Sequence, residues 1–147
     1  MIIKVNDSNI ACAAEIHSES WKQSHRSFCS KDFIERHTAE HQEIYLRNEI
    51  EAGKNLYMLI KDHPVGIVSV YGNLIENLYV LPEEQRKGYG TELLLFAMEQ
   101  CPQTPTLWVL SNNPNAYSLY FKQGFRKTGK QHKLSETLFE YEMKRTE

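Results

Sequence analysis

The stretch of sequence that most constrains the fold covers residues 78 to 101 and reads LYVLPEEQRKGYGTELLLFAMEQC. It begins as an apolar strand, continues through proline and acidic residues to the cations Arg86 and Lys87, and becomes helical only after Gly88 and Gly90. A helix start has unpaired backbone N–H groups and a partial positive charge, and glycine lets a ligand approach the backbone closely. The pattern is therefore typical of a segment that binds phosphate groups.

The phosphate-binding segment can be compared with two nucleotide-binding patterns. The Walker pattern, in which a glycine is followed after four residues by Gly-Lys-Ser/Thr, is not found in the chain. The dinucleotide pattern Gly-x-Gly-x-x-Gly fails because Leu93 occupies the third glycine position. We therefore expect a different diphosphate ligand. The candidate binding residues are Gln85, Arg86, Lys87, Gly88, Tyr89, Gly90 and Thr91.

Length and composition limit the class of protein. The 147 residues suit a single domain, 1–147, which can bury a core without a metal or a disulfide. The net charge of -2 at pH 7 argues against a nucleic-acid partner held by overall positive charge. The three cysteines are odd in number and lack a CxxC spacing, so we expect neither a disulfide framework nor a metal site.

The distribution of apolar residues argues against a membrane-spanning segment and a secretion signal. The chain has no run of about 18 consecutive apolar residues, which is the length that a membrane span requires. The first residues, MIIKVNDSNIACAAEIHSES, lack the apolar core and cleavage site of a secretion signal. We therefore expect no membrane partner and a soluble, reducing, cytoplasmic setting. The sequence leaves open whether the protein forms a homodimer.

The expected elements follow the order β-α-α-β-β-β-α-β-α-β-β, which predicts a mixed α/β architecture. Strands are expected at residues 2–5, 56–61, 64–71, 74–80, 106–110, 125–129 and 137–144. Helices are expected from Ser8 or Asn9 to about Gln23, from Ser30 or Asp32 to Gly53, and at 89–101 and 113–125. The second helix would be continuous, and its buried face would consist of Phe33, Ile34, His37, His41, Ile44 and Tyr45.

Two motifs in the chain resemble those of the GNAT N-acetyltransferases. The first is the acetyl-CoA-binding motif Gln/Arg-x-x-Gly-x-Gly/Ala, whose fixed positions are Gln85, Gly88 and Gly90 here. The second motif, Asn-x-x-Ala-x-x-x-Tyr-x-x-x-Gly-Phe, is matched by Asn113, Ala116, Tyr120, Gly124 and Phe125. The motifs stand in the family's order and on the expected elements, so the resemblance covers nearly the whole chain.

The resemblance implies the acyl-CoA N-acyltransferase fold of this family. In that fold a mixed central sheet is flanked by helices and is splayed between strands 4 and 5, here 74–80 and 106–110. The implied co-substrate is acetyl-CoA, and its pantetheine arm would lie in the splay. Backbone groups of Leu78 and Val80 would bind the arm as they would bind an added strand.

The same resemblance implies an enzyme that moves an acetyl group from acetyl-CoA to a primary amine by direct attack in a ternary complex. The N–H groups from Arg86 to Thr91 would hold the pyrophosphate of the co-substrate. Asn113 would bind the pantetheine arm or shape its slot.

The reaction needs a base for the amine and an acid for the departing thiolate. The resemblance assigns the acid to Tyr120, on the short helix after the fifth strand. The family's usual glutamate base lies on the fourth strand, at a position that is Leu74 in this chain. Glu76 lies two residues further along and on the same strand face, so it is the candidate base, acting directly or through a water. The alternative for Glu76 is a solvated or cross-strand-paired carboxylate.

The acceptor would bind against the first two helices and their loop, about residues 17–37. The segment EIHSESWKQSHRSF, 15–28, resembles the first helix of many family members with small substrates. The candidate wall residues are Trp21, His25, Arg26, Phe28 and Phe33. Trp21 and Phe33 also suit ordinary core positions. The sequence identifies the acceptor only as an amine of a small molecule or a peptide.

Two other functions fit parts of the sequence. The segment HTAEH, 37–41, matches the zinc-peptidase signature His-x-x-Glu-His, in which His37 and His41 would share a metal. No motif marks a further glutamate ligand, however, and histidines that flank the apolar face of a helix are the plainer interpretation. A non-catalytic acyl-CoA sensor would keep the fold but not catalyse acetyl transfer. This alternative is open because position 74 is leucine, where the family usually has its glutamate base. Turnover distinguishes a sensor from an enzyme.

Overall fold

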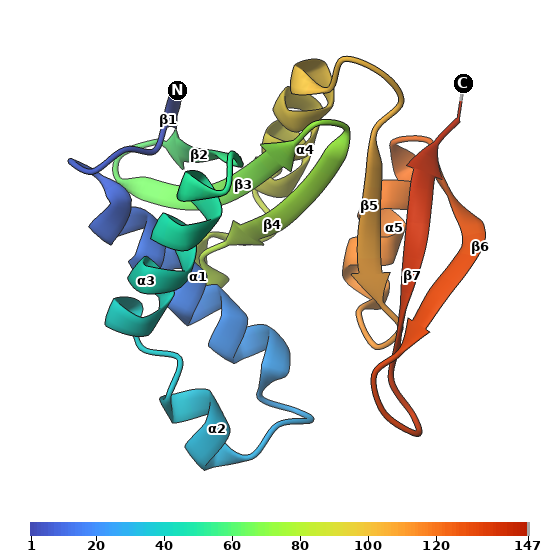
Figure 1. The fold of residues 1–147 in the computed structure, drawn as a ribbon, viewed down its shortest axis with the longest axis horizontal. Coiled ribbons are helices and arrows are strands. Elements are labelled where there is room, and N and C mark those ends of the chain that lie inside the picture. Colours follow the sequence, from blue (N-terminus) through green and yellow to red (C-terminus); the bar gives the residue numbers. More distant parts are fainter. Residues whose placement is uncertain (147) are drawn as a thin grey trace.

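One seven-stranded sheet runs through the molecule in the order β1-β2-β3-β4-β5-β7-β6 (Figure 1). The computed structural model describes residues 1–146, so only Glu147 of the expected domain 1–147 lies outside the described residues. The strands are β1 (Ile2–Lys4), β2 (Asn55–Ile60), β3 (Pro64–Tyr71), β4 (Leu74–Val80), β5 (Thr106–Leu110), β6 (Phe125–Lys133) and β7 (Phe139–Arg145). Neighbouring strands are antiparallel except β4 and β5, which are parallel. The sheet is therefore mixed, as the sequence predicts.

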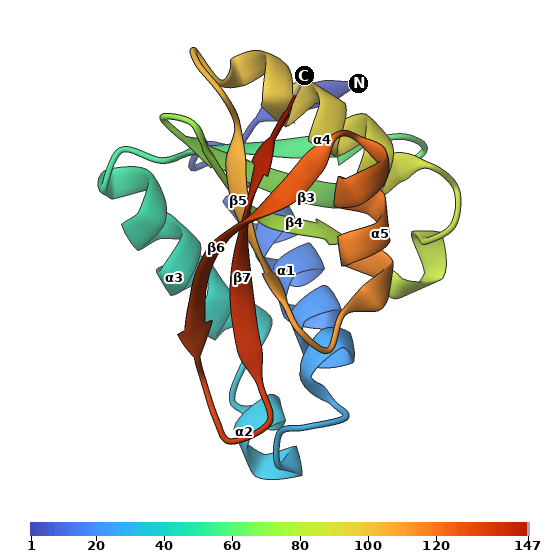
Figure 2. The ribbon, with the colours of Figure 1, turned by 90° about the vertical axis from the view of Figure 1, so that its right-hand side faces the viewer.

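The helices cover both faces of the sheet (Figure 1). They are α1 (Ile10–His25), α2 (Lys31–Glu35), α3 (Ala39–Glu51), α4 (Tyr89–Gln100) and α5 (Pro114–Lys122), together with a short 3-10 helix, η1 (Pro82–Glu84). Helices α1 and α3 pack on each other, and α1 also packs on β3 and β4. Helix α4 covers the other face of β3 and β4, and α5 packs on the arm formed by β5, β7 and β6 (Figure 2). None of the helices described in residues 1–146 is long and apolar enough to cross a bilayer.

The expected second helix is wrong as a single element, because the structure divides it into α2 and α3. Thr38 begins α3 as its N-cap, and its hydroxyl accepts a hydrogen bond from the His41 N–H at 3.1 Å. The residues expected on one buried face therefore belong to two helices, and Phe33 of α2 is 44% exposed while Ile44 of α3 is 64% exposed. The buried positions of α3 are instead Gln42 and Leu46, which lie one turn apart.

The sixth strand is longer than expected, since β6 continues to Lys133 rather than ending at Gly129. Its pairing with β7 shifts register between Lys127 and Gln131, and Gly129 lies inside that irregularity at a φ of 100°. A glycine that was interpreted as the end of a strand therefore marks a bulge within it.

Strands β4 and β5 form a splay, since they pair only at Leu74 and Thr106 and then separate. Strand β4 also carries a bulge, because its pairing with β3 shifts between Glu76 and Tyr79 and because Asn77 has a φ of 51°. The bulge changes which face later side chains occupy.

Two hydrophobic clusters show this change of face. Ile75, Leu78 and Val80 belong to the cluster on the α4 side of the sheet, which also contains Leu93 and Leu94 of α4. Tyr79 and Leu81 belong to the cluster on the α1 side, which also contains residues of α3. The end of β4 therefore presents Leu78 and Val80 to one side of the sheet and Tyr79 to the other.

His17 is an unusual member of the interface between α1, α3 and β4. Its side chain is 4% exposed, and the ring stacks on Tyr45 at 5.4 Å and meets Tyr79 edge-on at 5.0 Å. Its Nδ1 has no hydrogen-bond partner among residues 1–146. Burial therefore lowers the pKa of His17 from 6.5 to about 4, and the imidazole is neutral in the folded protein at neutral pH.

This burial makes the stability of the fold dependent on pH. The unfolded chain protonates His17 below pH 6.5 whereas the folded protein does so only near pH 4, so stability falls as the pH falls through that interval. Between pH 7 and pH 5 the free energy of unfolding should fall by roughly 2 kcal/mol through this group alone. Urea titrations of His17→Leu should lack this part of the loss, whereas a control with the exposed His41→Gln should retain it. Equal losses in wild type and His17→Leu would contradict the assignment.

Candidate functional site

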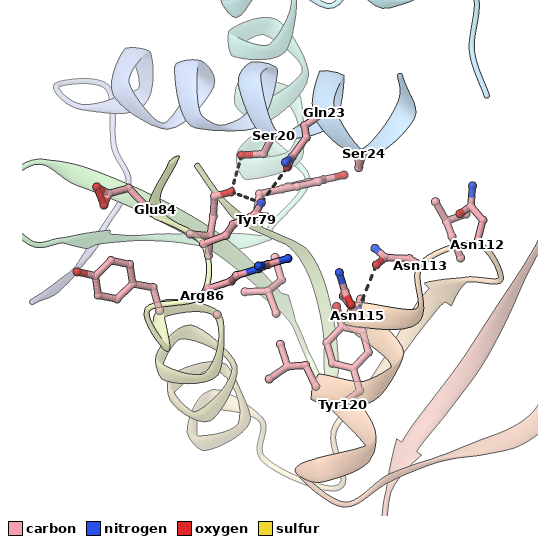
Figure 3. Close-up of a pocket in the computed structure, with 18 of the residues that line it drawn as sticks. Ser20, Gln23, Ser24, Tyr79, Glu84, Arg86, Asn112, Asn113, Asn115 and Tyr120 are labelled. Atoms are coloured by element: carbon pink, nitrogen blue, oxygen red, sulfur yellow. Dashed lines mark hydrogen bonds between the residues drawn. The ribbon is translucent and has the colours of Figure 1, made fainter. Parts of the chain in front are cut away.

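A cavity of about 690 Å³ lies in the splay beside the end of β4 (Figure 3). Its walls come from the second half of α1, the end of β4, the loop before α4, and the segment from the end of β5 into α5. The cavity therefore connects the phosphate-binding segment with the helix that carries Tyr120.

The loop between β4 and α4 has backbone N–H groups that the rest of the protein does not use. From Arg86 to Thr91, no backbone N–H donates a hydrogen bond to another of residues 1–146. Gly88 begins α4 in the left-handed conformation, with a φ of 84°, and a Cβ at this position would meet no atom within 4 Å. Unused N–H groups at a helix start with open space beside them suit a diphosphate.

Two cations of this loop behave differently. Arg86 has a φ of 66°, in the left-handed region that a non-glycine residue rarely adopts, and its side chain extends into the cavity (Figure 3). Strained backbone of this kind clusters at ligand-binding sites. The Lys87 ammonium instead pairs with the Glu84 carboxylate at 3.1 Å and does not itself line the cavity, although Glu84 does. Arg86 is therefore the cation placed to meet a ligand in the cavity.

Most of the residues that the sequence assigns to co-substrate binding line this cavity. They are Leu78, Val80, Gln85, Arg86, Tyr89, Gly90, Asn113 and Tyr120. Lys87, Gly88 and Thr91 adjoin it in the chain but do not line it.

The carbonyl of Val80 already has protein partners. It accepts hydrogen bonds from the Ser20 hydroxyl at 3.2 Å and from the Gln85 side-chain amide at 3.1 Å, and the same amide donates to Gln23 at 2.9 Å (Figure 3). A carbonyl oxygen has two lone pairs, so this one has no further acceptor capacity. The bonds also connect α1 to the phosphate-binding loop.

Helix α5 places two predicted residues at the cavity. Asn113 is its N-cap, since the side-chain oxygen accepts a hydrogen bond from the Ala116 N–H at 3.1 Å. Tyr120 is 9% exposed, and its ring packs edge-on against Phe125 at 6.1 Å. Burial raises the pKa of the Tyr120 hydroxyl to about 12, so the group keeps its proton at neutral pH and can donate it.

The face of α1 that meets the cavity is not the one that the sequence analysis selected. The lining residues are polar and recur at helical spacing: Ser20, Gln23, Ser24 and, just beyond the helix, Ser27. None of the predicted acceptor residues Trp21, His25, Arg26 and Phe28 lines it. Short polar side chains carry no hydrophobic periodicity, so only the glutamine and serine spacing could have indicated this face.

The predicted acceptor residues instead form a stack of rings along α1. Trp21 lies between His25 at 4.0 Å and His37 at 3.6 Å, and Phe28 packs against His25 at 5.1 Å. Phe33 contacts the edge of this stack but is largely exposed, so its alternative assignment to the core is wrong. Arg26 follows the last turn of α1 and is exposed.

Glu76 lies on the α1 side of β4 and is part of an ion pair. The Lys54 ammonium contacts one oxygen of Glu76 and one of Glu49, both at 2.8 Å. Burial by itself would lower the pKa of Lys54, but the hydrogen bonds that it donates to Glu49 and Glu76 raise it overall. Glu76 does not line the cavity, so any base function would need an intervening water.

The HTAEH segment is not one helical face in the structure. His37 precedes the N-cap of α3, and its Nδ1 lies 2.9 Å from the Phe33 carbonyl, whereas His41 lies within α3. Among residues 1–146, no group of three or more histidine, cysteine or acidic side chains is arranged to hold a metal ion. We therefore do not pursue the peptidase interpretation.

Comparison with protein families supports the resemblance seen in the sequence. A family described as the acetyltransferase (GNAT) family matches residues 14–125, which is most of the chain. No curated protein matches the sequence.

Solved structures share the fold over nearly their whole length. PaiA N-acetyltransferase from Thermoplasma acidophilum, in complex with coenzyme A, is 24% identical, with a TM-score of 0.78 over 100% of this chain and 98% of that one. YncA from Salmonella typhimurium, with its cofactor acetyl-CoA, is 17% identical, with a TM-score of 0.68 over 98% of this chain and 91% of that one. A mutant of spermidine N-acetyltransferase SpeG from Vibrio cholerae is 16% identical, with a TM-score of 0.70 over 99% of this chain and 94% of that one.

The open space beside Gly88 generates a prediction for ligand binding, which extends to Gly90 two residues further along. Acetyl-CoA at about 100 times its dissociation constant should stabilise the protein by roughly 2.7 kcal/mol and raise its Tm. Gly88→Val or Gly90→Val should abolish the shift, because each places a side chain where the diphosphate would lie. Gly72→Val is the matched control, since Gly72 also has a positive φ, of 61°, and open space, but lies in the β3–β4 turn. An unchanged shift in both folded variants would place the ligand elsewhere.

Proposed function

The chain belongs to the GNAT acetyltransferase family, and on this premise we propose that it transfers the acetyl group of acetyl-CoA to a primary amine by direct attack in a ternary complex. Acetyl-CoA is the co-substrate of the family, and it supplies the acetyl group as an activated thioester. The observation that carries the proposal is the row of unused N–H groups from Arg86 to Thr91 at the edge of the cavity in the splay.

The residues at the cavity suit the parts of this co-substrate. The N–H groups at the start of α4 and the Arg86 guanidinium would bind the pyrophosphate. Leu78 and Val80 would hold the pantetheine arm along β4 through backbone groups, but not through the Val80 carbonyl, which is already saturated. The Nδ2 group of Asn113 would be an additional donor, because only its oxygen is used in capping α5.

The proposed reaction also needs an acceptor for the acetyl group. We propose a primary amine of a small molecule or a peptide, and we retain Trp21, His25, Arg26 and Phe28 as candidates for the outer part of its site. The spermidine N-acetyltransferase that shares the fold is an example of a protein named for an amine acceptor.

The direct test is a screen of amines and peptides with acetyl-CoA. It would record the release of free thiol and confirm each acylated product by its mass. Thiol release with a matching product supports the enzyme.

One observation favours a second candidate, a non-catalytic acyl-CoA sensor. The usual glutamate position is Leu74, and the nearby Glu76 is engaged by Lys54. Binding of acetyl-CoA without turnover of any acceptor would identify the sensor.

The candidate base leads to a prediction about turnover and pH. Glu76→Gln should lower kcat and flatten the acid limb of its pH profile, because an amide cannot take up the proton of the amine. The affinity for coenzyme A should stay unchanged, since Glu76 lies outside the cavity. The matched control is Glu49→Gln, which removes the other carboxylate on Lys54 but not the one on β4. Wild-type turnover of Glu76→Gln at every pH would exclude this role.

The candidate acid leads to a second prediction. Tyr120→Phe keeps the ring that packs on Phe125 and removes only the hydroxyl that would protonate the departing thiolate. Turnover should fall by roughly 10²- to 10⁴-fold, with the affinity for coenzyme A close to that of wild type. Tyr117→Phe is the control, since Tyr117 lies on the same helix but does not line the cavity. A fall of less than about threefold would mean that water protonates the thiolate.

A further inference from the structure

Tyr79 is a cavity residue for which the proposed reaction has no role so far. It lies on β4 between Leu78 and Val80, and the three residues line the same cavity. The side chains of Leu78 and Val80 pack toward α4, whereas that of Tyr79 packs toward α1. Tyr79 therefore borders the space beside the expected thioester from the side opposite to α4.

The ring of Tyr79 is held in place by its neighbours. His17 meets the ring edge-on, with 5.0 Å between centroids and 89° between planes, and His17 is itself stacked on Tyr45. Burial raises the pKa of the Tyr79 hydroxyl above its ordinary value. The group is therefore a fixed, protonated hydroxyl at neutral pH, with one donor hydrogen and two acceptor lone pairs.

The hydroxyl of Tyr79 is left free by the protein. It makes no hydrogen bond with any side chain or backbone group of residues 1–146 that the structure records, although Ser20 and Ser24 on α1 have partners. It is also not one of the fully buried unpartnered atoms, which are His17 Nδ1 and Gln42 Nε2 in the described residues. Figure 3 shows the ring beneath α1 with its hydroxyl directed toward Ser24.

Tyr120 borders the same cavity from α5, on the other side of the splay (Figure 3). The cavity thus has Tyr79 on the β4 arm of the splay and Tyr120 on the other arm. In a direct displacement the nucleophile and the leaving group occupy different sides of the reacting carbonyl. If Tyr120 stands beside the departing sulfur, Tyr79 is placed beside the incoming nitrogen.

From this geometry we infer that the Tyr79 hydroxyl binds the acceptor amine. Its oxygen accepts a hydrogen bond from an N–H of the neutral amine, which leaves the nitrogen lone pair free to attack the acetyl carbonyl. The attack forms the C–N bond and breaks the C–S bond, the base removes the proton from nitrogen, and the thiolate receives the proton of the acid. Tyr79 itself gains and loses no proton. The inference rests on the proposed acetyl transfer.

The test compares wild type with Tyr79→Phe, a variant that keeps the ring against His17. Turnover of acetyl-CoA is measured with propylamine, phenethylamine, spermidine and a peptide with a free N-terminal alanine. For each amine that wild type acetylates, kcat/KM for the amine should fall by roughly 5- to 100-fold, because one hydrogen bond to the substrate is lost. The KM for acetyl-CoA should change by less than about twofold. Tyr57→Phe is the control, since Tyr57 packs on Phe96 and does not line the cavity.

The outcomes separate this inference from the proposed function. Turnover by wild type with unchanged amine kinetics in Tyr79→Phe would overturn the role of Tyr79 and leave acetyl transfer standing. An equal loss of affinity for acetyl-CoA would also overturn it, because a merely structural change at β4 would weaken both substrates. Wild type that acetylates none of the four amines would overturn the proposed function and this inference with it.

Discussion

The site depends on the short contact between two parallel strands. β4 and β5 pair only at Leu74 and Thr106, so the rest of β4 has no strand beside it on that edge. Backbone N–H and C=O groups that lose a ladder partner need another one, and the Val80 carbonyl finds it in Ser20 and Gln85. The separation of the strands therefore creates the cavity and also a strand edge to which an extended molecule can bind.

The bulge in β4 and the start of α4 determine which chemical groups border the cavity. Consecutive side chains of a strand face opposite sides of the sheet, and the bulge at Asn77 shifts this alternation by one residue, so that Leu78 shares the face of Ile75 whereas Tyr79 faces α1. The loop that follows needs the left-handed conformation at Gly88, and also at Arg86, to turn into α4. The start of α4, which suits a phosphate group, and the end of β4, which borders the cavity, are therefore separated by only a few residues of chain.

Sequence reasoning succeeded where a residue type reports directly on backbone geometry. Gly88 and Gly90 predicted the start of α4, and Asn113 marked the start of α5, where the structure shows it as the cap. It failed where tertiary packing decides where a helix begins and which of its residues are buried. Thr38 could have been a mid-helix residue, and only the structure shows that it caps α3 and that Phe33, in the separate helix α2, lies at the surface.

The polar wall of the cavity was missed for a related reason. The serines of α1 look like an ordinary solvent-facing side of a helix, and nothing in their spacing indicates that they border the splay. Sequence reasoning selected the aromatic residues Trp21 and Phe28 instead, which pack with histidines and do not line the cavity. Hydrophobic periodicity identifies which face of a helix is buried, but it does not identify which polar face meets a ligand.

Amide hydrogen exchange with and without acetyl-CoA tests the central claim most directly, because it reports on each backbone group separately. The account predicts that acetyl-CoA slows exchange at the N–H groups from Arg86 to Thr91 and along β4 at Leu78 to Val80, while the exposed strand β6 stays unchanged. Slower exchange confined to other segments, or none between Arg86 and Thr91, would contradict the claim that this loop and the splay hold the co-substrate.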